Sequence, residues 1–244
     1  MIKNIIFKGV SFDNIKIEDF DELIKKKGLF VFPSGPGLAS MDNNIKYYDS
    51  LKKADHVFFD SGFFVLLLRI FKNIKVSKFS GYKFLELFFF YLKKNKTKSI
   101  FCIDPNHKFS KSNKIYLQKL GVKKIYNYVA PKYDPKNLLD KQLLKKIIKT
   151  KPSFIMTNIG GGTQEVLGLY MKKNLKFRVN IFCTGGAISF FTGDQAPINN
   201  LIDKLYLGWF IRLIYNPFTF IRRYFYALKL LPMVLNSDVK IKSD

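Results

Sequence analysis

Short apolar segments alternate with amphipathic segments along most of this chain, and that alternation is the strongest constraint on its fold. Six apolar segments have the length and composition of β-strands, and segments with a helical pattern separate them. The predicted strands are residues 28–32, 56–59, 99–103, 124–127, 153–156 and 179–183. The predicted helices are residues 42–53, 62–71, 82–94, 111–120, 140–149 and 164–173. This order predicts an α/β fold, with a parallel sheet and helices on both faces.

The composition is that of a basic chain with ample material for a core. The formal net charge is +24, yet 48% of the residues are hydrophobic, which excludes a disordered basic tail. Such a charge suits nucleic acid, anionic lipid or a phosphorylated ligand, and the composition does not choose among them. Only five of the 42 basic residues are arginines. The two cysteines, Cys102 and Cys183, are too few for a disulfide framework and favour a reducing compartment.

The last part of the chain differs in character from the rest. Residues 205–235 contain four basic residues, no acidic residue and many large apolar ones, and Pro217 is expected to divide them into two helices. We therefore divide the chain into an α/β domain, residues 1–200, and an amphipathic basic C-terminal appendage, residues 201–244. An anionic membrane surface and simple packing on the core explain this pattern equally well. No signal peptide is visible, and no uncharged apolar run reaches the roughly 18–20 residues of a membrane span.

A glycine-rich segment, residues 158–165, follows one predicted strand and leads into a helix. Glycines there let a backbone approach a ligand, and the amides of a helix N-terminus favour an anion. Gln164 and Glu165 supply polar groups that can read a sugar or a base. The segment is neither a Walker loop nor a dinucleotide fingerprint. A tight turn with Glu165 at the positive end of the helix remains the alternative.

Asp60 follows the predicted strand 56–59. Because ligands of parallel sheets bind beyond the carboxyl ends of strands, a carboxylate there can serve as a general base. Its alternative role is the N-cap of the next helix, for which both Asp60 and Ser61 are suited.

Several blocks of the sequence, in their order, resemble the WecG/TagA/CpsF glycosyltransferases, which form glycosyltransferase family 26. The blocks are residues 158–165, 184–193, 196–197, 207–209, 212–213, 216–217 and 222–224. Weaker similarity through residues 60–62 and Gly81 extends the resemblance back to about Gly28.

The resemblance implies a Rossmann-like domain with a C-terminal appendage that attaches to the membrane. It implies inverting, metal-independent transfer of a sugar, of the N-acetylmannosamine type or related, from a UDP-sugar. The acceptor would be a sugar linked to polyprenyl diphosphate at the inner, cytoplasmic face of the cell membrane, in the synthesis of bacterial surface polysaccharide. The partners expected are this donor, this acceptor and an anionic membrane, without nucleic acid, metal or cofactor. No pattern decides whether the chain forms a homo-oligomer.

The resemblance also assigns roles to residues. Asp60 matches the proposed catalytic base, and Gln164 with Glu165 matches a Gln-Glu pair of which Gln164 is expected to be catalytic. The expected substrate-binding residues are Ser34, Gly161, Gly162, Thr163, Glu165, Gly185, Gly186, Arg212, Arg222 and Arg223. The chain departs from the family pattern at residues 32–35, 60–62 and 162–163, and at Gln195, which replaces an arginine.

Two other classes of function remain to be weighed. A non-catalytic basic module could bind anionic lipid or nucleic acid, but no RNA-recognition or helix-turn-helix signature accompanies the charge. An oxidoreductase with a nucleotide cofactor lacks the fingerprint glycines and the ribose-binding acid.

Overall fold

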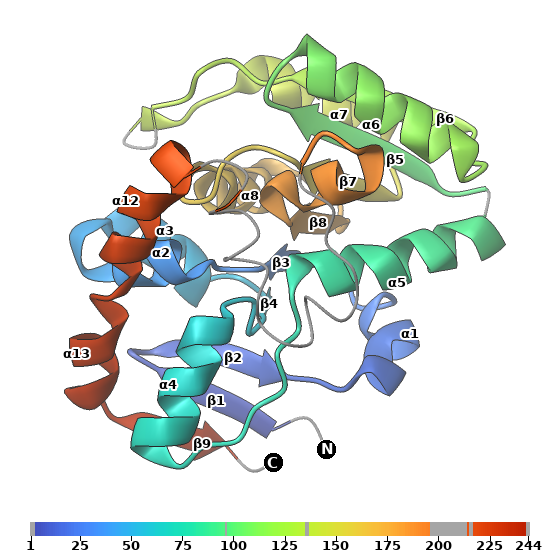
Figure 1. The fold of residues 1–244 in the computed structure, drawn as a ribbon. Helices are drawn as coiled ribbons and strands as arrows, with labels where there is room; N and C mark the ends of the chain where they lie inside the picture. The colour runs from blue at the N-terminus through green and yellow to red at the C-terminus, as the bar shows by residue number, and fades with distance from the viewer. Residues whose placement is uncertain (1–2, 96, 135–136, 196–213, 215–216, 243–244) are drawn as a thin grey trace.

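A six-stranded parallel sheet forms the centre of the protein in a computed structural model (Figure 1). The structure describes residues 3–95, 97–134, 137–195, 214 and 217–242. The order of the strands across the sheet is β4-β3-β8-β7-β5-β6. Their bounds are β3 (Leu29–Val31), β4 (His56–Val57), β5 (Ser99–Asp104), β6 (Lys124–Val129), β7 (Phe154–Thr157) and β8 (Asn180–Cys183). Each of the six lies within or overlaps a predicted strand, so the predicted α/β fold is confirmed.

Helices cover both faces of this sheet, as predicted. They are α3 (Ile45–Lys52), α4 (Gly62–Lys72), α5 (Gly81–Lys94), α6 (His107–Lys119), α7 (Lys141–Thr150) and α8 (Thr163–Asn174). Because neighbouring strand residues point to opposite faces, Phe101 and Ile155 pack with α7 and α8, while Phe154 and Phe182 pack with α5. The second core is rich in phenylalanine rings, which is where much of the aromatic content lies.

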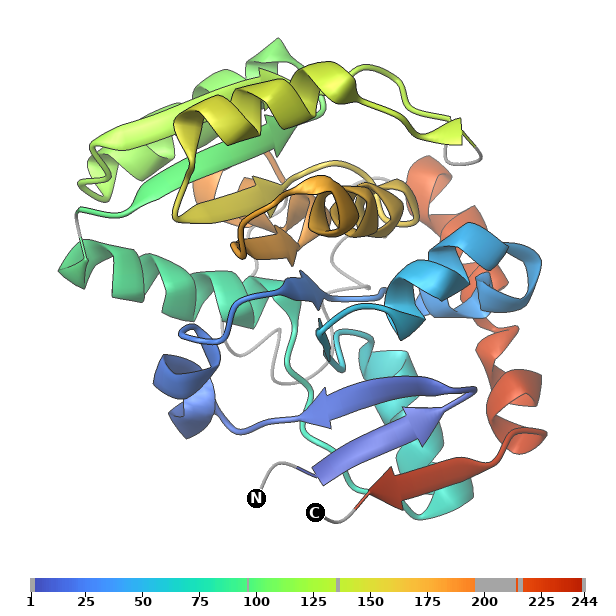
Figure 2. The same cartoon turned by 180° about the vertical axis from the view of Figure 1, so that it is seen from behind.

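A small antiparallel sheet, of order β2-β1-β9, was not predicted. It joins β1 (Lys3–Phe7) and β2 (Val10–Asn14) to β9 (Val239–Lys242), so the end of the chain pairs with its beginning (Figure 2). Phe7, Val10 and Phe12 are fully buried, and the ring of Phe64 in α4 packs at a tilt against those of Phe7 and Phe12. The small sheet and α4 therefore extend one of the two cores.

The C-terminal residues that the structure describes form α12 (Pro217–Ala227), α13 (Leu230–Leu235) and β9. Pro217 is the first residue of α12, where its missing N–H costs no hydrogen bond. Leu230 and Val234 are fully buried against α4 and the short helix α2 (Gly35–Ala39), which was not predicted. Within the described residues, no helix is both long enough and apolar enough to cross a membrane.

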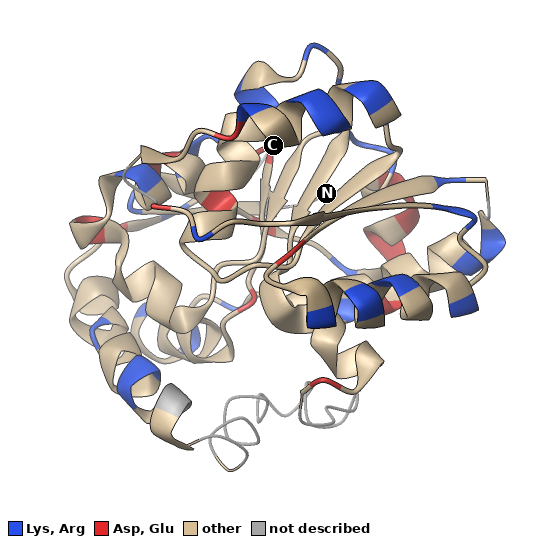
Figure 3. Ribbon diagram, turned by 90° about the horizontal axis from the view of Figure 1, so that it is seen from above, with Lys and Arg blue, Asp and Glu red and all other residues tan. Residues whose placement is uncertain are grey.

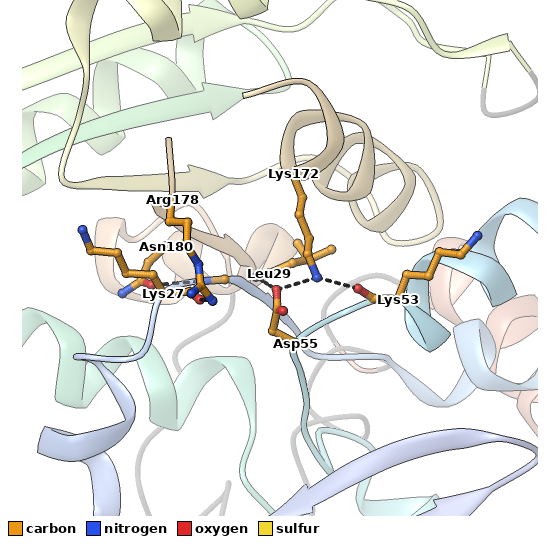
Figure 4. A network of polar contacts seen from close by, with 8 residues as sticks. Lys27, Leu29, Lys53, Asp55, Lys172, Arg178 and Asn180 are labelled. Carbon is orange, nitrogen blue, oxygen red and sulfur yellow. Dashed lines mark hydrogen bonds and ion pairs between the residues drawn. The ribbon is translucent and has the colours of Figure 1, made fainter. Parts of the chain in front are cut away.

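A polar network fixes the amino-terminal edge of the parallel sheet (Figure 4). Asp55 accepts a hydrogen bond of 2.7 Å from the backbone N–H of Leu29, and Lys172 Nζ lies 2.8 Å from the same carboxylate. Lys172 also donates to the carbonyl of Lys53, and Asn180 donates to that of Ile24. This edge is closed by internal contacts, which leaves the opposite edge for a ligand.

Candidate active site

The loops at the carboxyl edge of the parallel sheet bring together residues from distant parts of the chain. Asp60 follows β4, and its Oδ1 accepts a hydrogen bond of 2.8 Å from the backbone N–H of Gly81, the first residue of α5. A methyl group on Gly81 would lie 3.5 Å from the carbonyl oxygen of Thr184, which follows β8. Asp60 and the loop after β8 therefore meet at one helix N-terminus.

Asp60 is not the N-cap of α4, because Ser61 takes that role. The Ser61 Oγ accepts a hydrogen bond of 3.2 Å from the backbone N–H of Phe64. The half-buried Asp60 carboxylate instead faces the first turn of α5, whose positive end stabilises a negative charge. One alternative role is thereby excluded, and the carboxylate lies where a general base is expected.

Gln164 joins the two loops after β7 and β8. Its Oε1 accepts hydrogen bonds from the backbone N–H of Gly185 at 2.7 Å and from Thr157 Oγ1 at 3.3 Å. Its Nε2 donates to Glu165 at 3.0 Å and to the carbonyl of Cys183 at 3.1 Å. The side chain is buried and its amide is bonded on both sides, so Gln164 fixes the positions of Gly185 and Glu165.

Glu165 is a buried carboxyl group with an unusual pKa. Burial raises this pKa to about 7, and the charge of Asp60 adds to the rise. Hydrogen bonds oppose the rise, including one of 2.6 Å from the backbone N–H of Gly162 and the one from Gln164. The two carboxyl groups are therefore close enough for the charge of Asp60 to disfavour ionisation of Glu165.

Tyr47 interacts with the charges of both carboxyl groups, and sequence reasoning missed it. Its phenol is fully buried, and its pKa is raised by burial, then by the charges of Glu165 and Asp60. A methyl group on Gly37 would lie 2.6 Å from the Tyr47 hydroxyl, so α2 approaches the phenol closely. Nothing in the helical pattern of residues 42–53 distinguishes Tyr47 from an ordinary core residue.

The glycine-rich turn between β7 and α8 faces open space. A methyl group on Gly160, Gly161 or Gly162 would meet no atom within 4 Å. Gly162 has a φ of +89°, which disfavours other residues, and Thr163 begins α8. In contrast, a methyl group on Gly186 would lie 2.9 Å from Gln195 Nε2. The space above residues 160–162 is thus available to a ligand at the positive end of α8.

Ser34 and the C-terminal helices lie next to the Asp60 loop. Ser34 caps α2 by accepting a hydrogen bond of 3.3 Å from the backbone N–H of Gly37. A methyl group on Gly35 would lie 3.0 Å from Ser61 Oγ and 3.6 Å from Ala227 Cβ. The end of α12 therefore reaches the residues that border Asp60.

The two described arginines of α12 lie on different sides of the helix. Residues four apart share a helix face, so Arg223 lies on the side of the buried Ala227, which borders the site. Arg222 and Arg223 are both exposed, and Arg222 lies one position further around the helix from that side. Arg212 lies outside the described residues.

A buried polar cluster supports the loop after β7, and sequence reasoning did not select it. Asp104, at the end of β5, is fully buried and accepts hydrogen bonds from the side-chain amides of Asn113, Asn127 and Asn158, at 2.7, 3.1 and 2.7 Å. Asn158 begins the glycine-rich segment. The cluster thus anchors that segment to β5 and α6.

In the described part of the chain, no three His, Cys, Asp or Glu side chains are grouped to hold a metal ion. Cys102 and Cys183 are buried free thiols. The site residues described above supply carboxyl, amide, hydroxyl and backbone N–H groups at the carboxyl edge of the parallel sheet.

The model of the glycosyl transferase WecG/TagA/CpsF family matches residues 4–243 of this chain. The chain belongs to this family. As a WecG/TagA/CpsF glycosyltransferase it is an enzyme that transfers a sugar from a donor to an acceptor. The interpretations as a non-catalytic basic module and as an oxidoreductase are thereby set aside. A comparison with curated proteins gives no match.

Proposed function

We propose that this glycosyltransferase moves a sugar, of the N-acetylmannosamine type or related, from a UDP-sugar to an acceptor linked to polyprenyl diphosphate. The reaction would invert the anomeric centre and need no metal ion. One arrangement carries the proposal. The charge of Asp60 acts on Glu165, in the first turn of α8 beside the open glycine-rich turn, and Ser61, the residue after Asp60, lies beside Gly35, which approaches Ala227 at the end of α12.

The Asp60 carboxylate is the general base of this reaction. It removes the proton of the acceptor hydroxyl while that oxygen attacks the anomeric carbon of the donor. The bond from this carbon to the diphosphate oxygen breaks, and UDP leaves from the opposite face. The hydrogen bond from the backbone N–H of Gly81 orients the Asp60 carboxylate at the start of α5.

Positive groups at the site stabilise the departing diphosphate. The backbone N–H groups at the start of α8 border the open space, and Arg223 lies on the site side of α12. Arg212 and Arg222 complete the proposed set of arginines. Gly185, which Gln164 holds in place, and Gly186 line the nucleotide site, and Ser34 contacts the donor.

The surface of α12 supports association with an anionic membrane. Phe218, Ile221 and Phe225 of α12 and Leu228 just after it recur at intervals of three and four residues, and all are exposed, Phe218 to 90%. An exposed apolar stripe beside Arg222 has the composition of a helix that lies in a membrane interface. The enzyme would thus meet its lipid-linked acceptor at the inner face of the cell membrane, in synthesis of bacterial surface polysaccharide.

Replacement of Asp60 by Asn tests the catalytic role. The amide oxygen of Asn can still accept the hydrogen bond from Gly81, so the loop is retained while the base is lost. We expect a loss of transfer of about 100-fold or more, with donor affinity nearly unchanged, since general bases contribute on this order. The measurements are transfer to a lipid-linked acceptor and calorimetric titration with UDP-sugars.

Asp49→Asn is the matched control, because Asp49 forms an exposed ion pair with Lys53, and such pairs contribute little to stability. Its transfer rate should equal that of the wild type. Normal turnover by the Asp60→Asn variant would remove Asp60 from the mechanism.

A further inference from the structure

The outward face of α4 is apolar, although no described element covers it. Phe64, Val65, Leu67 and Leu68 point into the core, while Leu66, Ile70 and Phe71 are exposed, Ile70 to 67%. Leu66 and Ile70 are four residues apart and form a stripe with Arg69 beside them. By contrast, the outward face of α7 carries mainly lysines around the single Ile148. A solvated helix normally resembles α7.

The face of α4 adjoins the C-terminal helices. α13 packs along α4, and Lys72 Nζ donates a hydrogen bond of 3.1 Å to the carbonyl oxygen of Leu235, the last residue of α13. In Figures 1 and 2, α4, α12 and α13 lie on the same side of the molecule. Exposed apolar residues therefore occur both on α4 and on the C-terminal segment that packs on it through α13. They are Leu66, Ile70 and Phe71 on α4, Phe218, Ile221 and Phe225 on α12, and Leu228 just after α12.

The charges within these two segments have one sign, although Asp60 and Asp238 flank them. Residues 62–78 contain four basic residues and no acidic one, and residues 217–237 contain three basic residues and no acidic one. Lys and Arg also occur along other outer helices (Figure 3). Apolar side chains among cations match an anionic bilayer, which offers hydrocarbon beneath negative headgroups.

We propose that the outward face of α4, formed by Leu66, Arg69 and Ile70, is a second membrane-contacting element that docks on an anionic bilayer together with α12. This inference rests on the proposed membrane association of α12. Two contacts would fix the orientation of the protein, and since α4 begins directly after Asp60 and Ser61, they would hold the catalytic edge close to the bilayer.

A second copy of the chain is a poorer occupant of this face. A two-fold symmetric contact places a surface patch against itself. Arg69, Lys72 and Arg222 would then meet like charges, with no acid of 62–78 or 217–237 to neutralise them.

Vesicle binding by the full-length chain tests the proposal. Leu66→Gln with Ile70→Gln keeps the helix propensity and removes the apolar face. We expect partition onto vesicles of phosphatidylcholine and phosphatidylglycerol to fall about tenfold, since two interfacial aliphatic side chains are lost. The matched control, Ile115→Gln with Ile148→Gln, changes exposed aliphatic residues of α6 and α7 and should bind like the wild type.

A third variant, Phe218→Gln with Phe225→Gln, separates this inference from the proposed function. If only this variant loses binding, the association through α12 stands and the role of α4 is overturned. If the wild type does not bind these vesicles, both are overturned. If the α4 variant instead dissociates a dimer and binds vesicles normally, the face serves self-association and the inference fails.

Direct contact can be measured with a fluorophore, because both native cysteines are buried and resist labelling. An environment-sensitive dye on Leu66→Cys should shift to shorter wavelength when the anionic vesicles are added. The same dye on Ile148→Cys should not shift. An unchanged spectrum at position 66 would overturn the contact.

Discussion

At the scale of single residues, the buried carboxyl group of Glu165 makes folding depend on pH. Its pKa is raised from 4.5 in the unfolded chain to about 7 in the fold, mainly by burial. Between these values the native state binds more protons than the unfolded state, so the free energy of unfolding falls as pH rises. The stabilisation is complete below pH 4.5 and is lost as pH passes 7.

We predict that Glu165→Gln removes this pH dependence. In the wild type the free energy of unfolding should fall by up to about 3 kcal/mol between pH 5 and 8, as the shift in pKa requires. In the variant the free energy of unfolding should fall less between these pH values, by that amount, whatever its absolute stability. Urea unfolding at several pH values measures this, and parallel curves for the two proteins would refute the raised pKa.

Two neighbouring glycines should respond differently to alanine. Gly162 has a φ of +89°, so Gly162→Ala should destabilise the fold by about 1–2 kcal/mol. Gly161 lacks a positive φ and faces open space, so Gly161→Ala should leave the unfolding midpoint unchanged. If the donor occupies that space, the methyl group should weaken UDP-sugar binding several-fold, which calorimetry measures. Unchanged donor affinity for Gly161→Ala would place the donor elsewhere.

At the scale of elements, α13 is part of the core. Leu230 is fully buried, so Leu230→Ala should lower the free energy of unfolding by about 2–4 kcal/mol. The nearby Leu228 is exposed to 53%, and Leu228→Ala should cost less than about 0.5 kcal/mol. Chemical denaturation measures both changes. Equal effects would mean that α13 does not pack as described.

The elements differ in how far the sequence could predict them. The six parallel strands are short, apolar and bounded by helices, so their local pattern was sufficient. The pairing of β9 with β1 joins residues at opposite ends of the chain, and a local sequence pattern cannot predict which distant strand will pair with it. The same limit applies within the site. Asp60 and Gln164 follow strands and could be selected, whereas Tyr47 and Asp104 gain their surroundings only through distant packing.

At the scale of the whole molecule, the C-terminal residues have two roles: they present an exposed apolar surface, and they contribute to the core. Residues 201–244 were predicted to form an appendage, and α12 presents an apolar stripe that suits a membrane. Yet Leu230 and Val234 are buried against α2 and α4, and β9 completes the small sheet. The segment that we propose for membrane contact is therefore continuous with the core.

Truncation after Leu201 should consequently do more than release the enzyme from the membrane. Loss of α13 exposes the apolar faces of α2 and α4, and loss of β9 leaves β1 as an unpaired edge. We expect vesicle binding and transfer to vanish, and the unfolding midpoint to fall by more than 5 °C, on the order of a loss of 2 kcal/mol or more. The Phe218→Gln with Phe225→Gln variant should lose vesicle binding without a fall in the unfolding midpoint, because both side chains are exposed. A truncated enzyme with normal stability and transfer would contradict both roles of the segment, whereas a stable but inactive one would contradict only its structural role.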